Sequence, residues 1–294
     1  MPDPTPLTRA LLRSRGVSDD RITYAIRNGS LAPIARGLYL RRIDYDALDA
    51  FGLHRVRARH EGSRLQPGHA LSHVSAALVH GFDVWDVDLS RIHVSGSKGR
   101  ITESTYRHQT RFSDGDLVDI GVPVTSTERT IVDLARSLPF EQAVVAGDSA
   151  LRLDPSARDR LPDAVLSASW GHGAAAARAV VSFLDGRSES VGESRSRVRI
   201  AECGLPTPIL QQAVRARDGR TYRLDFFWKD SGVIGEFDGL GKYDDRRDLV
   251  AEKRREDALR ELGFQVVRWT WRDLDRFDAV AACITRAGKS RKHA

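Results

Sequence analysis

The stretch RLDFFWKDSGVIGEFDGLGKYDD, residues 223–245, decides how the C-terminal part of the chain folds. It holds two short apolar runs, and each run carries a carboxylate where a plain core strand would carry Val or Leu. The KDSG segment between the runs has the composition of a hairpin turn, so we predict two antiparallel strands. Neighbouring strands lie about 4.8 Å apart, and Asp225 and Glu236 are therefore expected within reach of one cation.

The alternation of side chains assigns two faces to each strand. On the first strand it predicts one shared face for four large residues: Tyr222, Leu224, Phe226 and Trp228. On the second strand it predicts that Glu236 and Asp238 share a face with Ile234.

Two or three carboxylates on a half-buried sheet face repel one another and raise one another's pKa. A positive group must compensate them, because an unpaired buried charge is costly. Ligands that are all oxygen, with no paired Cys or His nearby, favour Mg²⁺ or Mn²⁺ over Zn²⁺. A basic side chain is the open alternative, and Arg255 and Lys242 are the candidates for such a structural bridge.

The segments around the hairpin complete a familiar order of elements. GESRSRVRIAECG, residues 192–204, predicts a helix with Glu193 in its first turn. DLVAEKRREDALRELG, residues 248–263, predicts a second helix, and FQVVRWTW, residues 264–271, predicts a third strand. Helix, strand, turn, strand, helix, strand is the core order of the restriction-endonuclease-like fold, usually called PD-(D/E)XK.

Residues 190–275 resemble the branch of that fold related to very-short-patch repair endonuclease, which includes a large actinobacterial group known as a domain of unknown function. The strings that carry the resemblance are ESRSR, GLPTP, RLDFFW, GEFDG and EKRREDALRELGFQVVRWTWRDL. The resemblance implies metal-dependent hydrolysis of DNA phosphodiesters. It matches Glu193 to the helix Glu, Asp225 to the strand Asp and Glu236 to the Glu of the Glu-x-Lys motif.

The lysine of that motif is Asp238 in this chain, and the repair-endonuclease branch also dispenses with the lysine. The implied chemistry places a Mg²⁺ or Mn²⁺ ion on carboxylates, where it polarises the phosphate and activates a water. The expected metal ligands are Asp225, Glu236 and Glu193. The expected catalytic group adds Asp238 and two cations for the phosphoryl charge, and its members are Glu193, Asp225, Glu236, Asp238, Lys242 and Arg255.

Plainer roles stay open for several of these residues. Glu193 lies four residues before Arg197 and could form a surface helix pair with it. Lys242 could be solvated, and Arg255 could bridge the cluster structurally.

The N-terminal segment PLTRALLRSRGVSDDRITYAIRNGSLAPIARGLYLRR, residues 6–42, predicts helix, tight turn, helix and hairpin, which is a winged helix-turn-helix. Residues 1–44 carry eight Arg against four Asp, a local excess that suits contacts to phosphate. The residues expected to bind DNA are Arg21, Arg27, Arg36 and Arg41. A winged helix used for protein contacts, or a small cap with solvated arginines, is the open alternative. The segment resembles the N-terminal domain of AbiEi-type antitoxins, and the resemblance implies a repressor.

Residues 45–187 predict a mixed α+β middle domain that ends in a helical connector. This part is similar to the middle region of actinobacterial AbiEi-like proteins. Its histidines show no HxxxH or HxH pair on a recognisable helix, so we expect partly buried or surface side chains rather than a metal or catalytic site. These histidines are His69, His73, His80, His93 and His108.

The chain has 294 residues, which favours two or three domains, and a formal net charge of +6 with a sequence pI of about 9.6. Its two cysteines, Cys203 and Cys283, indicate neither a disulfide framework nor a zinc ribbon. No stretch approaches the roughly 18 apolar residues of a membrane span, and the N-terminus lacks an apolar signal core. We therefore expect a cytoplasmic protein.

The expected fold is a multidomain α/β (α+β) protein: a winged helix at 1–44, a middle domain at 45–187, a nuclease-like core at 188–280 and a basic tail at 281–294, whose last residues RAGKSRKHA, 286–294, we expect to be disordered. The leading function is a DNA-binding, Mg²⁺-dependent endodeoxyribonuclease that cleaves or nicks DNA. The alternative is an antitoxin-type regulator whose nuclease fold is an inactive scaffold. A third reading is an interaction module that serves a toxin partner.

Overall fold

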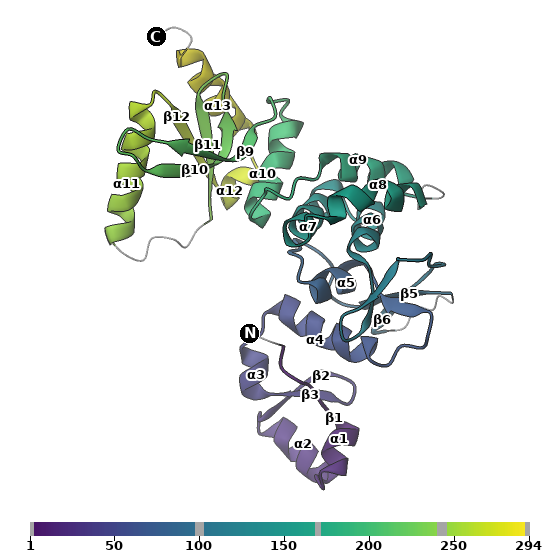
Figure 1. Ribbon diagram of the computed structural model, residues 1–294. Coiled ribbons are helices and arrows are strands. Elements are labelled where there is room, and N and C mark those ends of the chain that lie inside the picture. The colour runs from purple at the N-terminus through teal and green to yellow at the C-terminus, as the bar shows by residue number, and fades with distance from the viewer. Residues whose placement is uncertain (1–2, 98–102, 168–171, 240–245, 292–294) are drawn as a thin grey trace. The chain divides into compact units, whose positions relative to one another are not determined.

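The computed structural model describes residues 3–97, 103–167, 172–239 and 246–291 (Figure 1). Within these residues the chain forms thirteen helices and three sheets, which confirms the expected multidomain α/β class. In the same residues, no helix combines the length and the apolar character needed to cross a membrane.

The contacts of the chain divide it into two compact units. The first comprises Met1–Leu138 and Ser156–Ala179, and the second comprises Pro139–Pro155 and Val180–Ala294. The second unit therefore begins upstream of the expected boundary at residue 187 and is discontinuous in sequence. The expected domain bounds themselves stay a prediction.

The N-terminal segment folds as helix, turn, helix and hairpin. Its elements are β1 (Leu7–Thr8), α1 (Arg9–Ser14), α2 (Asp19–Arg27), β2 (Leu31–Ala35) and β3 (Leu38–Arg41). The strand order is β1-β3-β2, and both pairings are antiparallel. Ser18 caps α2, since its Oγ accepts a hydrogen bond from the backbone N–H of Arg21. Gly37 makes the turn of the hairpin with a φ of 73°, a backbone conformation that favours glycine.

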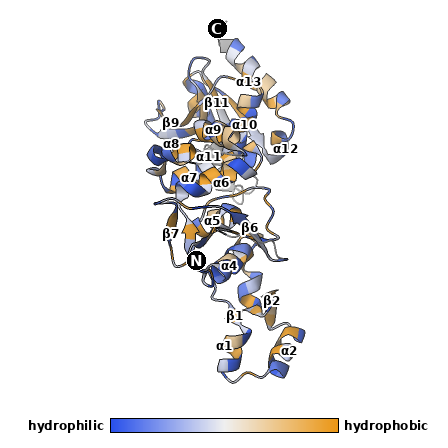
Figure 2. Cartoon of the chain, turned by 90° about the vertical axis from the view of Figure 1, so that its right-hand side faces the viewer, coloured by the Kyte–Doolittle hydropathy of each residue, from blue (hydrophilic) through white to orange (hydrophobic). Residues whose placement is uncertain are grey.

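The rest of the first unit is a five-stranded sheet with helices. Its elements are α3 (Arg42–Asp46), α4 (Ala50–Gly62), β4 (His69–Leu71), α5 (His73–His80), β5 (Ile92–Gly96), β6 (Thr105–Gln109), β7 (Leu117–Asp119), β8 (Pro123–Thr125), α6 (Thr127–Ser137) and α8 (Ala157–Ser167). The strand order is β6-β5-β4-β8-β7. Helix α6 is amphipathic (Figure 2), and its apolar residues Ile131, Val132 and Leu134 are buried.

The second unit is built on a four-stranded sheet of order β12-β11-β10-β9. Its elements are α7 (Phe140–Leu153), α10 (Val191–Glu202), β9 (Ile209–Arg215), β10 (Thr221–Trp228), β11 (Val233–Asp238), α11 (Arg246–Glu261), β12 (Gln265–Thr270), α12 (Trp271–Leu274) and α13 (Asp278–Arg291), and α9 (Ala174–Phe183) enters it at Val180. β10 pairs antiparallel with β9 and β11, as the KDSG turn predicts, and β11 pairs parallel with β12. Such a parallel pair needs a crossover, and α11 supplies it.

Ion pairs join α7 to α10 inside the second unit. Arg195 and Arg199 both bind Glu141, at N–O distances of 2.9 and 2.7 Å. Arg197 binds Asp148, whose side chain is fully buried, at 2.5 Å. The buried pair of Arg197 and Asp148 exists only while residues 139–155 belong to the unit.

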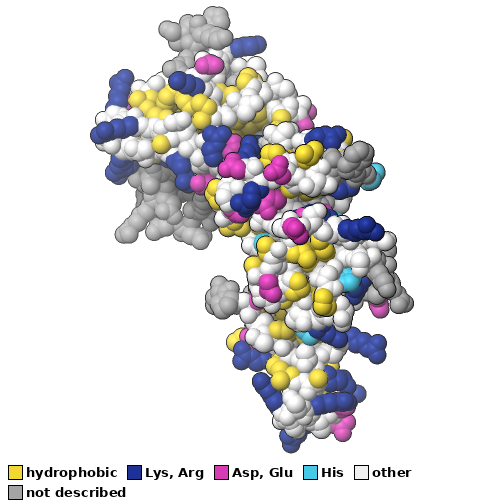
Figure 3. Space-filling view, turned by 45° about the vertical axis from the view of Figure 1, so that its right-hand side comes forward, with side chains coloured by type: hydrophobic (Ala, Val, Ile, Leu, Met, Phe, Trp, Pro, Cys, Tyr) yellow, Lys and Arg dark blue, Asp and Glu magenta, His cyan; other side chains and the backbone are white. Residues whose placement is uncertain are grey.

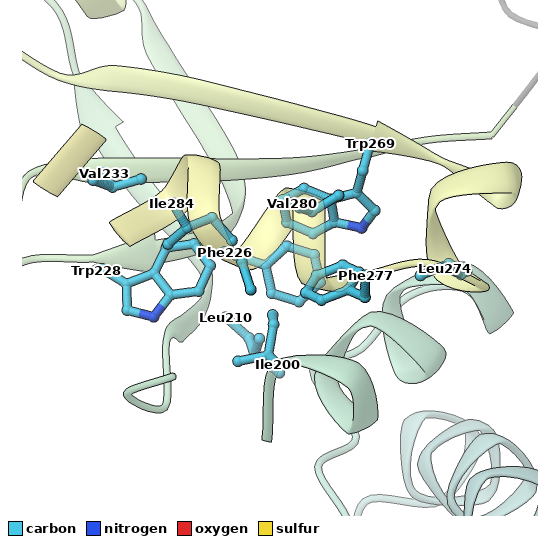
Figure 4. Close-up of a cluster of buried hydrophobic side chains, with 11 residues drawn as sticks. Ile200, Leu210, Phe226, Trp228, Val233, Trp269, Leu274, Phe277, Val280 and Ile284 are labelled. Atoms are coloured by element: carbon cyan, nitrogen blue, oxygen red, sulfur yellow. The ribbon is translucent and has the colours of Figure 1, made fainter. Parts of the chain in front are cut away.

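The sheet of the second unit has an apolar cluster on each face. One cluster gathers side chains from α10, β10, β12 and α13, among them Ile200, Phe226, Trp269 and Ile284 (Figure 4). The other packs Leu224, Phe227 and Ile234 against Leu259 of α11.

The expected single face for the large residues of β10 is wrong. Phe226 and Trp228 belong to the first cluster, whereas Tyr222 and Leu224 pack in the second. The change of face falls at Asp225, opposite Gln211 of β9, which has a φ of 53° and stands between the pairs Leu224↔Gln212 and Phe226↔Leu210. The regular alternation of faces does not continue through this position.

The expected disorder of residues 286–294 is also wrong for the described part, residues 286–291. Asp278–Arg291 forms α13, and its residues Ala281 and Ile284 are buried against the sheet. Ala281, Ile284 and Ala287 form an apolar stripe at helical spacing. The prediction missed this stripe because it considered only the basic residues of the tail.

Candidate functional site

Four polar residues form a row across the sheet of the second unit, one on each strand: Gln211, Asp225, Glu236 and Arg268. Glu236 and Arg268 are register partners in β11 and β12. Asp225 stands opposite Gln211, and the register that pairs Phe226 with Gly235 places Glu236 next along β11 toward Asp225. The register therefore places Asp225 and Glu236 at facing positions of neighbouring strands, as the hairpin turn predicts.

Asp225 lies where β10 and β11 part. The pairing of the two strands ends at Phe226↔Gly235, while β11 continues alongside β12 to Asp238↔Thr270. Asp225 Oδ2 accepts a hydrogen bond from the backbone N–H of Phe237 at 3.1 Å, which joins the two strands at the point where they separate, here called the fork.

Glu236 is buried, with 6% of its surface exposed, and two guanidinium groups compensate its charge. Arg255 Nη2 lies 2.6 Å from Oε1, and Arg268 Nε lies 3.2 Å from Oε2. Arg255 also donates to the backbone carbonyl of Arg223 at 2.7 Å. Of the two expected candidates for a structural bridge, the structure therefore shows Arg255 in that position, and it adds Arg268, which the sequence did not suggest.

Glu193 caps the N-terminus of its own helix, α10. Ser190 Oγ accepts from the backbone N–H of Glu193, and the Glu193 carboxylate accepts from Ser190 Oγ at 2.9 Å and from the backbone N–H of Glu189 at 2.9 Å. The proposed pair with Arg197 is wrong, because Arg197 binds Asp148. Glu193 reaches the polar row through Gln211, whose Nε2 donates to Glu193 Oε2 at 2.8 Å.

The remaining expected site residues have different positions. Asp238 is half-buried at the end of β11, opposite Thr270. Lys242 lies outside the described residues.

The oxygen atoms of the row fit a hard divalent cation in part. Gln211 Oε1 is buried and has no hydrogen-bond partner among the described residues, although it stands opposite Asp225. A carboxylate and an amide oxygen are ligands that Mg²⁺ accepts. Glu236 fits less well as a ligand, since both of its oxygens face arginines. Asp225 and Gln211 are thus the better-placed pair for a metal, and the sequence did not single out Gln211.

The four arginines expected to bind DNA lie on the N-terminal segment, and all are exposed. Arg21 and Arg27 are on α2, and Arg36 is at the tip of the hairpin. No described acidic side chain pairs with these three. Arg41 differs, because its guanidinium binds Asp44 at 2.6 Å and its charge is locally compensated. Figure 3 shows basic side chains gathered over this part of the chain.

Two further features of this surface were missed. Tyr24 is 69% exposed on α2, three residues from both Arg21 and Arg27, and only its position on a short amphipathic helix could have indicated it. An open hollow of ≈ 1090 Å³ beside the hairpin is lined by basic side chains that include Arg36, Arg57 and Arg64. Arg57 and Arg64 come from the middle segment, so no local pattern connects them with the hairpin.

Three histidines of the middle segment lie together. His73, His93 and His108 each offer a ring nitrogen to one group, in which all three atoms lie within 4.8 Å of one another. Their positions on α5, β5 and β6 explain why sequence spacing gave no sign of the group.

Comparison with known proteins gives the following similarities. No family model matches the chain. Uncharacterized protein Rv2248 of Mycobacterium tuberculosis (strain ATCC 25618 / H37Rv) is 31% identical over 201 residues, which cover 68% of this chain and 74% of that protein. Uncharacterized protein MT2308 of Mycobacterium tuberculosis (strain CDC 1551 / Oshkosh) is similar to the same extent.

Proposed function

The chain belongs to the family of the mycobacterial protein Rv2248, and we propose that it is a cytoplasmic DNA-binding protein with a metal-dependent nuclease site in its second unit. The substrate class is duplex DNA, and the reaction is hydrolysis of a phosphodiester bond. The fork at Asp225 carries this proposal.

The fork supports the proposal because the register places two acidic residues at facing positions of neighbouring strands. Asp225 and Glu236 are adjacent across two strands, and Gln211 links the row to Glu193. A sheet gains no stability from neighbouring acids, so a functional role is the simpler account of Asp225.

The residues divide the work as follows. Asp225, with the Gln211 amide oxygen, would hold a Mg²⁺ or Mn²⁺ ion, which when bound supplies a Lewis acid for the phosphate and an acidified water. Glu193 keeps the Gln211 side chain oriented through its 2.8 Å hydrogen bond. Arg255, half-buried next to Glu236, is the described cation best placed to stabilise negative charge on phosphoryl oxygens.

The first unit would bind the DNA. Arg21, Arg27 and Arg36 are exposed and unpaired among described residues, so their positive charge is available to phosphates. Tyr24 adds an exposed aromatic ring to the same helix. Arg57 and Arg64 extend the basic surface beyond the hairpin.

One observation favours a second candidate, a DNA-binding regulator with an inactive nuclease fold. Arg255 and Arg268 compensate Glu236 without any metal, and the motif lysine is replaced by Asp238. A cluster that is already neutralised can serve stability alone.

Incubation of the full chain with supercoiled plasmid, with and without Mg²⁺ or Mn²⁺, separates the two candidates. The nuclease predicts nicked or linear DNA only with the metal, and loss of that product in Asp225→Asn. The matched control is Asp230→Asn, an exposed carboxylate in the turn of the same hairpin, which should cleave like the parent. Binding of plasmid without cleavage under every metal condition would favour the regulator.

A further inference from the structure

Three histidines from separate elements of the first unit meet at one place. His73 opens α5, His93 lies on β5 and His108 lies on β6. β5 and β6 are parallel, and their register pairs His93 with Tyr106 and Ser95 with His108. His93 and His108 therefore point to the same side of the sheet, one pair apart, because side chains alternate along a strand.

The distances in this group match a single metal ion. His93 Nδ1 lies 2.9 Å from His108 Nε2, and one nitrogen from each of the three rings lies within 4.8 Å of the others. A tetrahedral zinc ion with Zn–N bonds of about 2.0 Å holds its ligand nitrogens roughly 3.3 Å apart. The rings of His73 and His108 are stacked at 3.7 Å, so binding requires a rotation that turns their in-plane lone pairs toward one point.

In the hydrogen bond between His93 Nδ1 and His108 Nε2 one nitrogen is the donor and the other the acceptor, so a metal ion at this place would replace that hydrogen bond. Neutral imidazole is the form that binds metals. Ser72 Oγ lies 3.0 Å from His73 Nδ1 and can accept a hydrogen bond from a proton on that nitrogen. In this tautomer the lone pair of His73 Nε2 is the one that can bind a metal.

A buried carboxylate lies beside the group. Asp133 is 5% exposed and acts electrostatically on His108. Its Oδ1 accepts from Arg129 Nε at 2.9 Å, whereas its Oδ2 is buried and has no hydrogen-bond partner among the described residues. Asp116 also binds Arg129, at 2.9 Å, so the guanidinium next to the group is already compensated.

The backbone holds His73 in an unusual conformation. Its φ is 51°, in the left-handed region, directly after β4. Non-glycine residues in that region cost free energy and are concentrated at functional sites. At this junction the conformation brings the His73 ring over His108.

We propose that His73, His93 and His108 bind one divalent ion of the zinc class and leave its fourth coordination position to water or an anion. Three imidazole nitrogens suit Zn²⁺, Cu²⁺ or Ni²⁺, whereas Mg²⁺ prefers oxygen. Three protein ligands with an open fourth position is the arrangement of catalytic rather than structural zinc sites. His93 and His108 are half-buried, so a small ligand can reach that position. The site is separate from the carboxylates of the second unit and does not depend on the function proposed for them.

The test is metal binding to the full chain after chelator treatment, with Zn²⁺ in calorimetry and Co²⁺ in visible absorption. We expect one ion per chain at this site, and Co²⁺ absorption typical of a tetrahedral nitrogen site. His93→Gln and His108→Gln should each weaken Zn²⁺ binding by at least the roughly 10–100-fold that loss of an outer-shell partner costs. Both residues are half-buried, so these variants are milder than a change at His73.

Two control variants show where the ion binds. His60→Gln alters a half-buried histidine of α4 outside the group, and Asp225→Asn alters the carboxylate row, so both should keep the zinc signal. If His108→Gln destabilises the chain, the parent still decides through the stoichiometry and spectrum of Co²⁺. No Zn²⁺ or Co²⁺ binding by the parent, or binding that survives in the double variant His93→Gln, His108→Gln, would overturn the proposal and leave an unliganded histidine stack.

Discussion

At the scale of single residues, Glu236 shows the tension between stability and chemistry. Its carboxylate is buried between Arg255 and Arg268. Glu236→Gln would leave both guanidiniums without their charged partner, and we expect a loss of about 3 kcal/mol in the free energy of unfolding. Urea unfolding of the full chain measures it.

The control for this prediction is Glu189→Gln. Glu189 pairs with Arg223 at 2.5 Å, but both side chains are more than a third exposed, so this substitution should change stability by less than about 1 kcal/mol. If Glu236→Gln were as stable as its parent, the arginines would not depend on Glu236, and its burial would need another cause.

His54 gives the first unit a pH-dependent stability. Burial lowers the pKa of His54 from 6.5 to about 4, and its ring lies 2.8 Å from Ser75 Oγ and 3.1 Å from the Leu89 carbonyl. The unfolded chain takes up a proton below pH 6.5 while the folded chain resists it. The stability is therefore complete above pH 6.5 and is lost as the pH falls toward 4.

His54→Gln removes this titration. Between pH 7 and pH 5 the parent should lose roughly 2 kcal/mol more than the variant, at about 1.4 kcal/mol per pH unit below 6.5. Urea unfolding at the two pH values measures the difference, in which the other histidines cancel. His172→Gln, at an exposed position of the same unit, should follow the parent. Equal losses in His54→Gln and the parent would contradict this account.

At the scale of elements, the basic tail of the chain folds as α13, and the apolar side of this helix packs in the core of the second unit. Ile284 is 4% exposed and packs in the cluster with Phe226 and Trp269. We expect Ile284→Ala to cost about 3 kcal/mol, the usual loss for a buried Ile cut to Ala. Thermal unfolding measures it, and Thr285→Ala, on the exposed side of the same helix, should have little effect. A disordered tail would make the two substitutions equivalent.

Elements were predictable where the information is local. Ser18 as a cap, the KDSG turn and the neighbouring acids on β10 and β11 all follow from short-range rules. The change of face at Asp225 was not predictable, because it departs from the regular alternation on which the prediction depends. Arg268 likewise enters the row only through a parallel pairing, which no local pattern specifies.

At the scale of the whole molecule, charge should govern the binding of DNA. The formal net charge is +6, and residues 1–44 carry eight Arg against four Asp. If the contacts are to phosphates, log affinity for duplex DNA should fall with log salt by about 0.9 per phosphate. The double variant Arg21→Gln, Arg27→Gln should reduce that slope by about 2, as measured by fluorescence anisotropy of the full chain over a salt series.

Arg217→Gln is the matched control, because Arg217 is an exposed arginine in the turn between β9 and β10 of the second unit. Its slope should equal that of the parent. If the slope of log affinity against log salt were unchanged in the double variant, the DNA contact would not be made by Arg21 and Arg27 of α2.

The discontinuous second unit limits how its gene can recombine. Residues 188–294 look like a cassette that could be inherited alone, but Arg197 binds Asp148, and Arg195 and Arg199 bind Glu141, and both acids are encoded far upstream. A fusion that copied only the cassette would leave Arg197 without Asp148, and would leave Arg195 and Arg199 only with Asp275 and Glu202. Descendants that carry the cassette are therefore expected to have replaced those acids, or to have kept the segment that encodes α7.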